Sequence, residues 1–282
     1  MLDRNENLKT TSSETNFSDI RLIVFQPGST FYEEPFDVRL QILEGQIQKA
    51  AHYLSEQTDS SKLKWMFVAP EYLFKDFSKT TVDRYYSQEQ KKKFTARLSE
   101  LSKQYPNMVI VPGTFCWKKE NRFRNSAYLF HNGQFERYKK TKPSLSDYDY
   151  LSGTTVSLGD ARLKFFNKDG KNPNSPIKIT NDLIIGIDIC LDNKYLIAQH
   201  TFLQQFKDKK MTVQLVIADG LKEERYMEQP NLLFAHIERQ EKDSLIGIVK
   251  ETDFPPIPTQ IEQPSPSDID VIDENLRVYR FK

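Results

Sequence analysis

Residues 183–190 have the sequence LIIGIDIC, a nearly continuous apolar run that ends in a cysteine. A run of this length suits a central β-strand whose two faces are both covered by other layers. Residues 63–69, LKWMFVA, and residues 212–218, TVQLVIA, have the same character. Because buried strands of this kind are typical of parallel sheets covered by helices, these three stretches predict an α/β protein.

Helical patterns alternate with the strands. From residue 36 onward, apolar residues recur at spacings of three and four, which makes one buried stripe along a helix. Ser87 and Gln90 form the capping-box pattern S-x-x-Q at the start of a second helix with an apolar face. Further strands are predicted at residues 20–25 and 107–112, so strands and helices alternate through the first two thirds of the chain.

The rest of the chain contains a hairpin signal and further short strands. Asn132 and Gly133 separate the runs SAYLFH and QFERYK, and Asn-Gly in this position predicts a β-hairpin with a type I′ turn. Residues 232–249 predict two short strands, and residues 276–281, LRVYRF, predict an edge strand. The sequence therefore predicts an α/β domain with a mixed sheet or sheets.

Polar and proline-rich segments mark the parts of the chain outside this pattern. Residues 1–18 are polar and predict a loose N-terminal arm, which leaves residues 19–282 as a single domain. Residues 167–176, NKDGKNPNSP, predict a surface turn. Five of the 14 prolines fall within residues 254–268, which predicts an extended connection rather than an interior strand.

The composition excludes several classes of function. The 282 residues include 40 Lys and Arg against 39 Asp and Glu, and a net charge of +1 gives no reason to expect nucleic acid or an anionic membrane as partner. No apolar stretch approaches the roughly 20 residues that span a bilayer. The first residues lack the apolar core of a secretory signal, and two distant cysteines form no disulfide scaffold. We therefore expect a cytoplasmic protein with free thiols.

Three reactive residues follow three of the predicted strands. Glu71 ends WMFVAPE, Lys140 ends FERYKK, and Cys190 ends IIGIDIC. Ligands of α/β sheets bind in the crevice beyond the carboxyl ends of the strands, so these side chains are candidates to converge there. A carboxylate can take the proton of a thiol, and a lysine ammonium can stabilise the oxyanion that forms when the thiolate attacks a carbonyl.

The residues after Cys190 predict the start of a helix. Asp192 or Asn193 is the expected N-cap. The backbone N–H of Leu191 is then a candidate second donor to the oxyanion. Tyr72 directly follows Glu71, and it either lines the pocket or packs in the core.

Each of these residues also has an ordinary structural interpretation. A cysteine after an apolar strand is often a packed small hydrophobe, a glutamate after Ala-Pro is often a loop acid, and a lysine in YKKTK is often solvated. Cys116 is expected in the core. His200 and His236 have no metal-ligand spacing, and we expect structural roles for both, although a papain-like Cys–His enzyme would use one of them.

The ordered motifs resemble the nitrilase (carbon–nitrogen hydrolase) superfamily over residues 20–220. FVAPEYLF is similar to the family's strand with Pro-Glu and places the general base at Glu71. The segment from VIVPGTF to NSAYLFHNGQFERYKK leads to a Tyr-x-Lys motif that places the catalytic lysine at Lys140. GIDICLD is similar to the nucleophile motif and places the nucleophile at Cys190.

The resemblance implies a four-layer α-β-β-α sandwich with two mixed β-sheets. It also implies hydrolysis through a covalent cysteine intermediate, with neither metal nor cofactor, and a possible homodimer. Many members carry a second glutamate after the lysine. This chain has SDYDYLSG there, so Asp147 or Asp149 is the candidate, and Asp147 has the better spacing.

The expected substrate is a small amide, carbamoyl or ureido compound. Cys-Leu-Asp in place of the Cys-Trp-Glu of true nitrilases favours an amidase-like member. Residues 221–282 depart from the family pattern, because the Arg-Ala-x-Glu-Asn helix is missing after VIADG. This departure leaves a second hypothesis open, a catalytically silent binding protein that keeps the fold.

Overall fold

The computed structural model describes most of the 282-residue chain. The described residues are 16–57, 64–120, 122–142, 147, 149–151, 154–156, 174, 176–206, 210–221, 230–250 and 260–282. The predicted arm at residues 1–18 and the predicted turn at 167–176 lie largely outside them. Part of the proline-rich connection, residues 251–259, also lies outside.

The first sheet is centred on three parallel strands: β1 (Ile20–Phe25), β2 (Lys64–Val68) and β3 (Met108–Val111). Antiparallel strands extend it on both sides: β4 (Thr114–Lys119), β5 (Arg122–His131), β6 (Gln134–Lys139), β15 (Ile269–Asp273) and β16 (Leu276–Arg280). Because parallel and antiparallel pairs share this sheet, it is mixed, as predicted.

The second sheet has the same plan. Its centre is again three parallel strands: β10 (Ile184–Ile189), β11 (Val213–Ile217) and β12 (Leu233–Ile237). Antiparallel strands flank them: β9 (Ile177–Lys178), β13 (Leu245–Val249) and β14 (Ile261–Glu262). A separate small ribbon pairs β7 (Asp149–Leu151) with β8 (Thr154–Val156).

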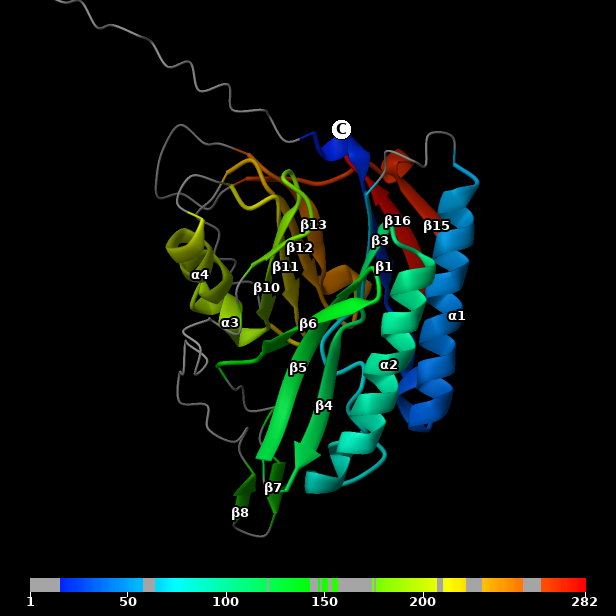
Figure 1. Ribbon diagram of the computed structural model, residues 1–282, viewed down its shortest axis with the longest axis vertical. Helices are drawn as coiled ribbons and strands as arrows, with labels where there is room; N and C mark the ends of the chain where they lie inside the picture. The colour runs from blue at the N-terminus through cyan, green and yellow to red at the C-terminus, as the bar shows by residue number, and fades with distance from the viewer. Residues whose placement is uncertain are drawn as a thin grey trace, which may run out of the picture.

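Helices cover the outer face of each sheet, so the molecule has four layers (Figure 1). The helices α1 (Phe36–Ser55) and α2 (Gln88–Gln104) lie against the first sheet. The shorter helices α3 (Leu191–Lys194) and α4 (Ile197–Gln205) lie against the second. Short 3-10 turns complete the described chain: Phe17–Asp19, Ser29–Glu33, Thr81–Arg84, Glu241–Asp243 and Pro266–Asp268. The predicted α-β-β-α sandwich is confirmed.

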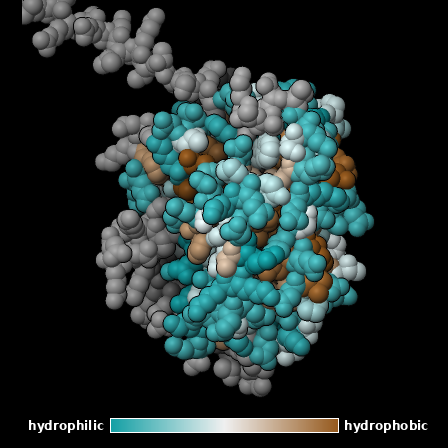
Figure 2. Space-filling view, turned by 45° about the vertical axis from the view of Figure 1, so that its right-hand side comes forward, coloured by the Kyte–Doolittle hydropathy of each residue, from teal (hydrophilic) through white to brown (hydrophobic). Residues whose placement is uncertain are grey.

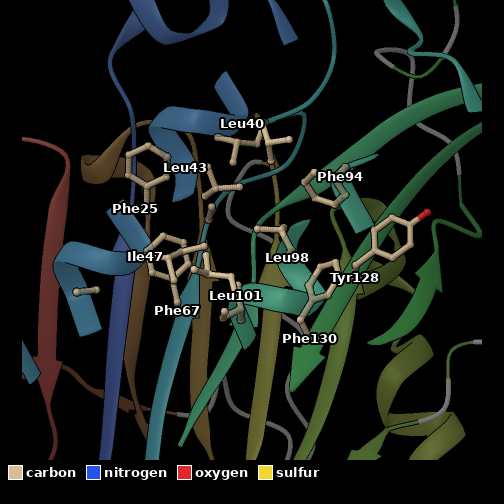
Figure 3. Close-up of a cluster of buried hydrophobic side chains, with 14 of the residues drawn as sticks. Phe25, Leu40, Leu43, Ile47, Phe67, Phe94, Leu98, Leu101, Tyr128 and Phe130 are labelled. Carbon is tan, nitrogen blue, oxygen red and sulfur yellow. The ribbon is translucent and has the colours of Figure 1, made fainter. Parts of the chain in front are cut away.

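Alternation along the strands explains why both faces of the first sheet are buried. In β1, Leu22 and Val24 face the second sheet, whereas Ile23 and Phe25 face the helices. Successive side chains of a strand point to opposite faces, so a continuous apolar run supplies both cores. Burying one such side chain stabilises the fold by about 1.5–3 kcal/mol. Figure 3 shows the helix-side core, where residues such as Leu43 and Ile47 of α1 meet Phe67 of β2.

Local sequence signals place several elements correctly. The side chains of Ser87 and Gln90 form the predicted capping box at the start of α2. Asn132 and Gly133 have φ angles of 48° and 77°, as a type I′ hairpin turn requires. The prediction of an edge strand at the C-terminus is wrong. β16 pairs with β1 on one side and with β15 on the other, so it lies inside the sheet.

The outer surface is mostly hydrophilic in the view of Figure 2, with small apolar areas between polar side chains. Among the described residues, no helix is both long enough and apolar enough to cross a membrane.

Candidate active site

One backbone hydrogen bond joins the two sheets, and another joins two strands of the second sheet, where the parallel strands end. Glu71 follows β2 in the first sheet, and its N–H donates to the carbonyl of Ala218 in the second sheet at 3.3 Å. Cys190 follows β10, and its N–H donates to Ile217 at 2.8 Å. The carboxyl ends of strands from both sheets therefore meet, which brings Glu71 and Cys190 to the same crevice.

Lys140 lies between two carboxylates. Its backbone N–H donates to Asn125 at 3.0 Å, which fixes the residue at the end of β6. Its Nζ is 2.8 Å from Oε1 of Glu71 and 2.7 Å from Oδ2 of Asp147, and all three side chains are fully buried. Burial alone would lower the pKa of Lys140, but the two carboxylates raise it above its usual value. The two carboxylates therefore favour the charged ammonium form of this lysine.

Cys190 has a backbone conformation that few residues other than glycine adopt. Its φ is 50° and its ψ is −110°, and it is the N-cap of α3. Such conformations raise the free energy of the chain by about 1–3 kcal/mol and concentrate at functional sites. The side chain is 6% exposed. Burial raises the pKa of the thiol, and the nearby charge of Glu71 raises it further, so the resting sulfur is protonated.

The carboxylate of Glu71 has one engaged oxygen and one available oxygen. Oε1 accepts hydrogen bonds from Lys140 and from Nδ2 of Asn125, the latter at 2.7 Å. Oε2 is buried and has no conventional hydrogen-bond partner among the described residues, and the Cys190 thiol interacts with this carboxylate. Burial raises the pKa of Glu71 to about 7, although Lys140 opposes the shift. A carboxyl with this pKa exchanges protons readily near neutral pH.

Asp147 is the acid that the structure brings to Lys140. Its Oδ1 accepts hydrogen bonds from the Tyr72 hydroxyl at 2.7 Å and from Asn125 at 3.1 Å. The Tyr85 hydroxyl donates to its backbone carbonyl at 3.0 Å. The other candidate, Asp149, starts the β7 ribbon, and its side chain lies outside the described part of the structure. Of the two candidates, only Asp147 has a described contact with Lys140.

A tight turn places Tyr72 beside the cluster. Tyr72 has a left-handed φ of 58°, and its N–H donates to Oγ1 of Thr114 at 2.8 Å. Gly113 comes just before Thr114, with φ of 69°. A Cβ at Gly113 would lie 2.1 Å from the carbonyl oxygen of Pro70, so only glycine fits there. Tyr72 is 2% exposed, so it both packs and contacts the cluster through its hydroxyl.

The helix after Cys190 differs from the prediction. Cys190 itself is the N-cap of α3, without a side-chain cap, so neither Asp192 nor Asn193 is the cap. Asp192 is buried within α3 and accepts hydrogen bonds from the backbone N–H groups of Thr141 and Lys142. The physical reason is distance along the chain. The loop after Lys140, about 50 residues away, supplies donors that no local pattern reveals.

Leu191 is the first residue of α3, where a helix has no internal acceptor for the backbone N–H. No hydrogen bond from this N–H is found within the described residues. The strained turn at Cys190 places the Leu191 N–H directly after the sulfur-bearing residue. Its role as a second donor to the oxyanion stays a prediction.

The other cysteine and the two histidines have no hydrogen bond to Glu71, Lys140 or Cys190 in the described part of the structure, although the charges of Glu71, Asp147 and Lys140 act on Cys116. Cys116 is fully buried in a cluster with Tyr72 and Tyr85. His236 is buried and its Nε2 is 3.0 Å from Oε1 of Glu238, whereas His200 is exposed. The charges that act on Cys190 come from Glu71, Lys140 and Asp147, not from a histidine. This pattern disfavours the papain-like hypothesis.

Sequence reasoning missed Asn125 and Tyr85. Asn125 lies on β5 and donates to both Glu71 and Asp147. Its only local signal was a polar residue at the start of the apolar run SAYLFH. Tyr85 lies between the 3-10 turn Thr81–Arg84 and α2. An aromatic residue is most simply read as part of the core, and nothing in the sequence linked Tyr85 to Asp147.

Comparisons with known proteins give similarity in structure alone. No protein-family model matches the sequence, and no curated protein matches it significantly. One similar structure is XC1258 of Xanthomonas campestris, described as a CN-hydrolase superfamily protein with an arsenic adduct in its active site. It has 12% sequence identity and a TM-score of 0.49, and the match covers 93% of this chain and 90% of XC1258. Another is Nit3 of Saccharomyces cerevisiae, described as a member of branch 10 of the nitrilase superfamily. It has 13% sequence identity and a TM-score of 0.46, and the match covers 81% of this chain and 82% of Nit3.

A third similar structure belongs to a longer protein. It is the glutamine-dependent NAD⁺ synthetase of Acinetobacter baumannii, with 16% identity and a TM-score of 0.47. The match covers 81% of this chain but only 40% of the synthetase. At these identities and TM-scores, the likenesses carry no inference about activity. The solved structures to which the fold is similar thus include nitrilase-superfamily members.

Proposed function

We propose that this chain is a nitrilase-superfamily hydrolase that cleaves non-peptide carbon–nitrogen bonds of small amide, carbamoyl or ureido substrates. One observation carries the proposal: a buried ammonium, Lys140, bridges two buried carboxylates, Glu71 and Asp147, beside the strained Cys190. Burying three charges at one point is costly unless they are paired, and such arrangements concentrate at functional sites.

Acylation is the first half of the proposed reaction. The Cys190 sulfur attacks the carbonyl carbon as its proton passes to Glu71. The free oxygen Oε2 is the acceptor, because Oε1 already accepts two hydrogen bonds. Lys140 and the Leu191 N–H stabilise the negative oxygen of the tetrahedral intermediate. The C–N bond then breaks, Glu71 gives its proton to the leaving nitrogen, and a thioester on Cys190 remains.

Deacylation uses the same residues. Glu71, again a carboxylate, takes a proton from water, and the hydroxide attacks the thioester carbonyl. The carbon–sulfur bond breaks, the acid leaves, and the sulfur recovers the proton from Glu71. The raised pKa of Glu71, about 7, suits a group that must act alternately as base and acid.

Asp147 and Asn125 would support this cycle without changing bonds. Asp147 keeps Lys140 charged and oriented when Glu71 becomes protonated, because the lysine then retains one carboxylate partner at 2.7 Å. Asn125 orients both carboxylates at once. The Cys-Leu-Asp motif favours an amide over a nitrile substrate.

The first test is release of ammonia from a panel of small amides and ureido compounds. Cys190→Ala is expected to abolish turnover, because the nucleophile is lost. Cys116→Ala is the matched control, since it removes the other thiol of the chain, and it is expected to retain turnover. Equal activity in wild type and Cys190→Ala would overturn the nucleophile assignment.

A labelling experiment separates a functional thiol from a packed one. Iodoacetamide followed by intact-mass analysis is expected to give a single adduct that Cys190→Ala removes and Cys116→Ala retains. Cys116 is fully buried, whereas Cys190 is 6% exposed at the crevice. Labelling without turnover of any substrate would favour the catalytically silent binding protein instead.

A further inference from the structure

Two residues with positive φ angles bracket the turn that follows β10. Cys190 has φ of 50° and ψ of −110°, and Leu196 has φ of 50° and ψ of 39°. The short helix α3 lies between them, and we call residues 190–196 the Cys190 turn. Residues other than glycine rarely adopt positive φ angles, and they keep them only where surrounding contacts fix the chain. The turn that presents the candidate nucleophile therefore needs contacts from outside it.

One buried carboxylate supplies such contacts on both sides of the Cys190 turn. Asp188 belongs to β10, lies two residues before Cys190 and is fully buried. Its Oδ2 accepts a hydrogen bond from Nδ2 of Asn193, in α3, at 3.2 Å. Its Oδ1 accepts from the backbone N–H of Ala198, in α4, at 2.9 Å. Asp188 thus joins the strand that ends at the sulfur to both helices that follow it.

The hydrogen bond from Ala198 replaces a missing helix cap. The N-cap of α4 is Leu196, whose apolar side chain makes no cap hydrogen bond. The first N–H groups of a helix have no acceptor within the helix, and the positive end of the helix dipole favours a negative charge. The Asp188 carboxylate satisfies both requirements from a neighbouring strand. It therefore stabilises the far end of the Cys190 turn, at Leu196, as well as the near end.

Two buried amide side chains fix the carboxylate in turn. Nε2 of Gln214, in β11, donates to Oδ2 of Asp188 at 2.9 Å, and Nε2 of Gln199, in α4, donates to Oε1 of Gln214 at 3.1 Å. Burial raises the pKa of Asp188, and the hydrogen bonds from Ala198, Asn193 and Gln214 oppose that shift. Because β11 is paired with β10, the position of the carboxylate is set by the sheet itself.

We propose that Asp188 is a positioning residue, which holds the Cys190 turn in its strained geometry and so keeps the Cys190 sulfur beside Glu71. Its hydrogen bonds run to Asn193, Ala198 and Gln214, so it acts on the sulfur through the backbone rather than by contact. The kinetic consequence rests on the proposed hydrolase function. The mechanical consequence, a turn that loosens without this carboxylate, can be measured without any substrate.

The first test compares the labelling rates of two thiols in one molecule. The full-length protein is treated with iodoacetamide under native conditions, and peptide mass analysis follows Cys190 and, over longer incubation, Cys116. A loosened turn exposes the Cys190 sulfur, and relief of burial increases its thiolate fraction. In Asp188→Ala we expect the rate at Cys190 relative to Cys116 to rise about tenfold or more. General destabilisation would instead accelerate labelling of the fully buried Cys116 at least as much.

Milder variants cover the case in which Asp188→Ala does not fold. Asp188→Asn keeps one acceptor oxygen, and Asn193→Ala removes a single hydrogen bond, so both should raise the ratio by less. Thr212→Val is the control, because the Thr212 hydroxyl accepts from Ile184 and donates to Asp182 at the opposite end of β10. It should leave the ratio within about twofold of wild type, although stability falls. A ratio that is unchanged or lower in the Asp188 variants would overturn the proposal.

The second test is kinetic and uses an amide that the wild type hydrolyses. Asp188→Asn should lower kcat about tenfold or more and change KM by less than about twofold, because the sulfur moves while the groups that contact substrate remain. Thr212→Val should leave both constants within about twofold. A change in KM alone would contradict the positioning role. If the wild type hydrolyses no amide, the hydrolase proposal fails, whereas the labelling ratio still decides the role of Asp188.

Discussion

The hydroxyl of Tyr72 donates a 2.7 Å hydrogen bond to Oδ1 of Asp147, the acid that contacts Lys140. Aspartate is one methylene shorter than glutamate, so it reaches less far. Tyr72 and Asn125 hold its side chain from one side, and the Tyr85 hydroxyl holds its backbone. Asp147 contacts Lys140 because these neighbours fix its position.

Tyr72→Phe tests this arrangement by removing one oxygen. A buried hydrogen bond to a charged group contributes about 1.5–3 kcal/mol, so we expect the free energy of unfolding to fall by that amount. We expect kcat to fall about tenfold, which corresponds to about 1.4 kcal/mol of barrier. Urea denaturation and steady-state kinetics measure the two effects.

Tyr86→Phe is the matched control for that substitution. The Tyr86 hydroxyl is also buried, yet it has no hydrogen-bond partner within the described residues. Removing it should leave both stability and kcat unchanged or raise stability slightly. Equal losses in the two variants would mean that the Tyr72 hydroxyl has no special relation to Asp147.

The pKa of Glu71 predicts the pH dependence of turnover. In the free protein Glu71 must be ionised to accept the thiol proton, and burial raises its pKa to about 7. The carboxylate fraction grows as pH rises, so kcat/KM should increase from pH 5.5 and level off above about pH 8. A profile that falls over this range would exclude Glu71 as the base.

Asn125→Ala should move that profile in a known direction. The Asn125 amide donates to Glu71 and so favours the carboxylate. Without it the pKa of Glu71 rises, and the rising limb shifts to higher pH, so activity is lost more at pH 6.5 than at pH 8.5. Thr95→Ala is the control, because the hydrogen bonds of the Thr95 hydroxyl, among the residues the structure describes, lie within α2. An unmoved limb in Asn125→Ala would contradict the assignment.

Asp192 joins the loop of Lys140 to the helix of Cys190. Its carboxylate accepts from the N–H and hydroxyl of Thr141 and from the N–H of Lys142, at 2.6–3.1 Å. Asp192→Ala should lower the free energy of unfolding by about 3 kcal/mol, since buried donors lose their acceptor. It should lower kcat more than it changes KM, because Lys140 shifts relative to the sulfur.

Asp192→Asn is the conservative comparison, since one oxygen acceptor remains. It should recover part of the stability and part of kcat. Thr141→Val removes only the hydroxyl bond of 2.7 Å and should have the smallest effect. If Asp192→Ala lowers the free energy of unfolding less than Thr141→Val does, the Asp192 carboxylate does not hold the loop.

The order of the elements and three site residues follow from local patterns. Continuous apolar runs specify the central strands, and apolar spacing of three and four specifies the helices, because each pattern records which faces of an element are buried. The Asn132–Gly133 turn and the Ser87 cap are equally local, since a few adjacent residues make all their contacts. Glu71, Lys140 and Cys190 are candidates because each follows a predicted strand, and the resemblance of their motifs to the nitrilase superfamily singled them out. Their catalytic roles stay a prediction.

Tertiary structure decided what depends on distant partners. β16 is interior because β1, more than 250 residues earlier, supplies the pairing edge. Three further roles depend on partners that only folding brings within hydrogen-bond distance. These are the contact of Asp147 with Lys140, the hydrogen bond from Asn125 to Glu71, and the anchoring of the Thr141 loop by Asp192. The sequence by itself determined which strands and helices form and where a thiol, an acid and an amine could meet. The three-dimensional packing of two sheets decided which further side chains reach them, because hydrogen bonds act over a few ångströms regardless of separation along the chain.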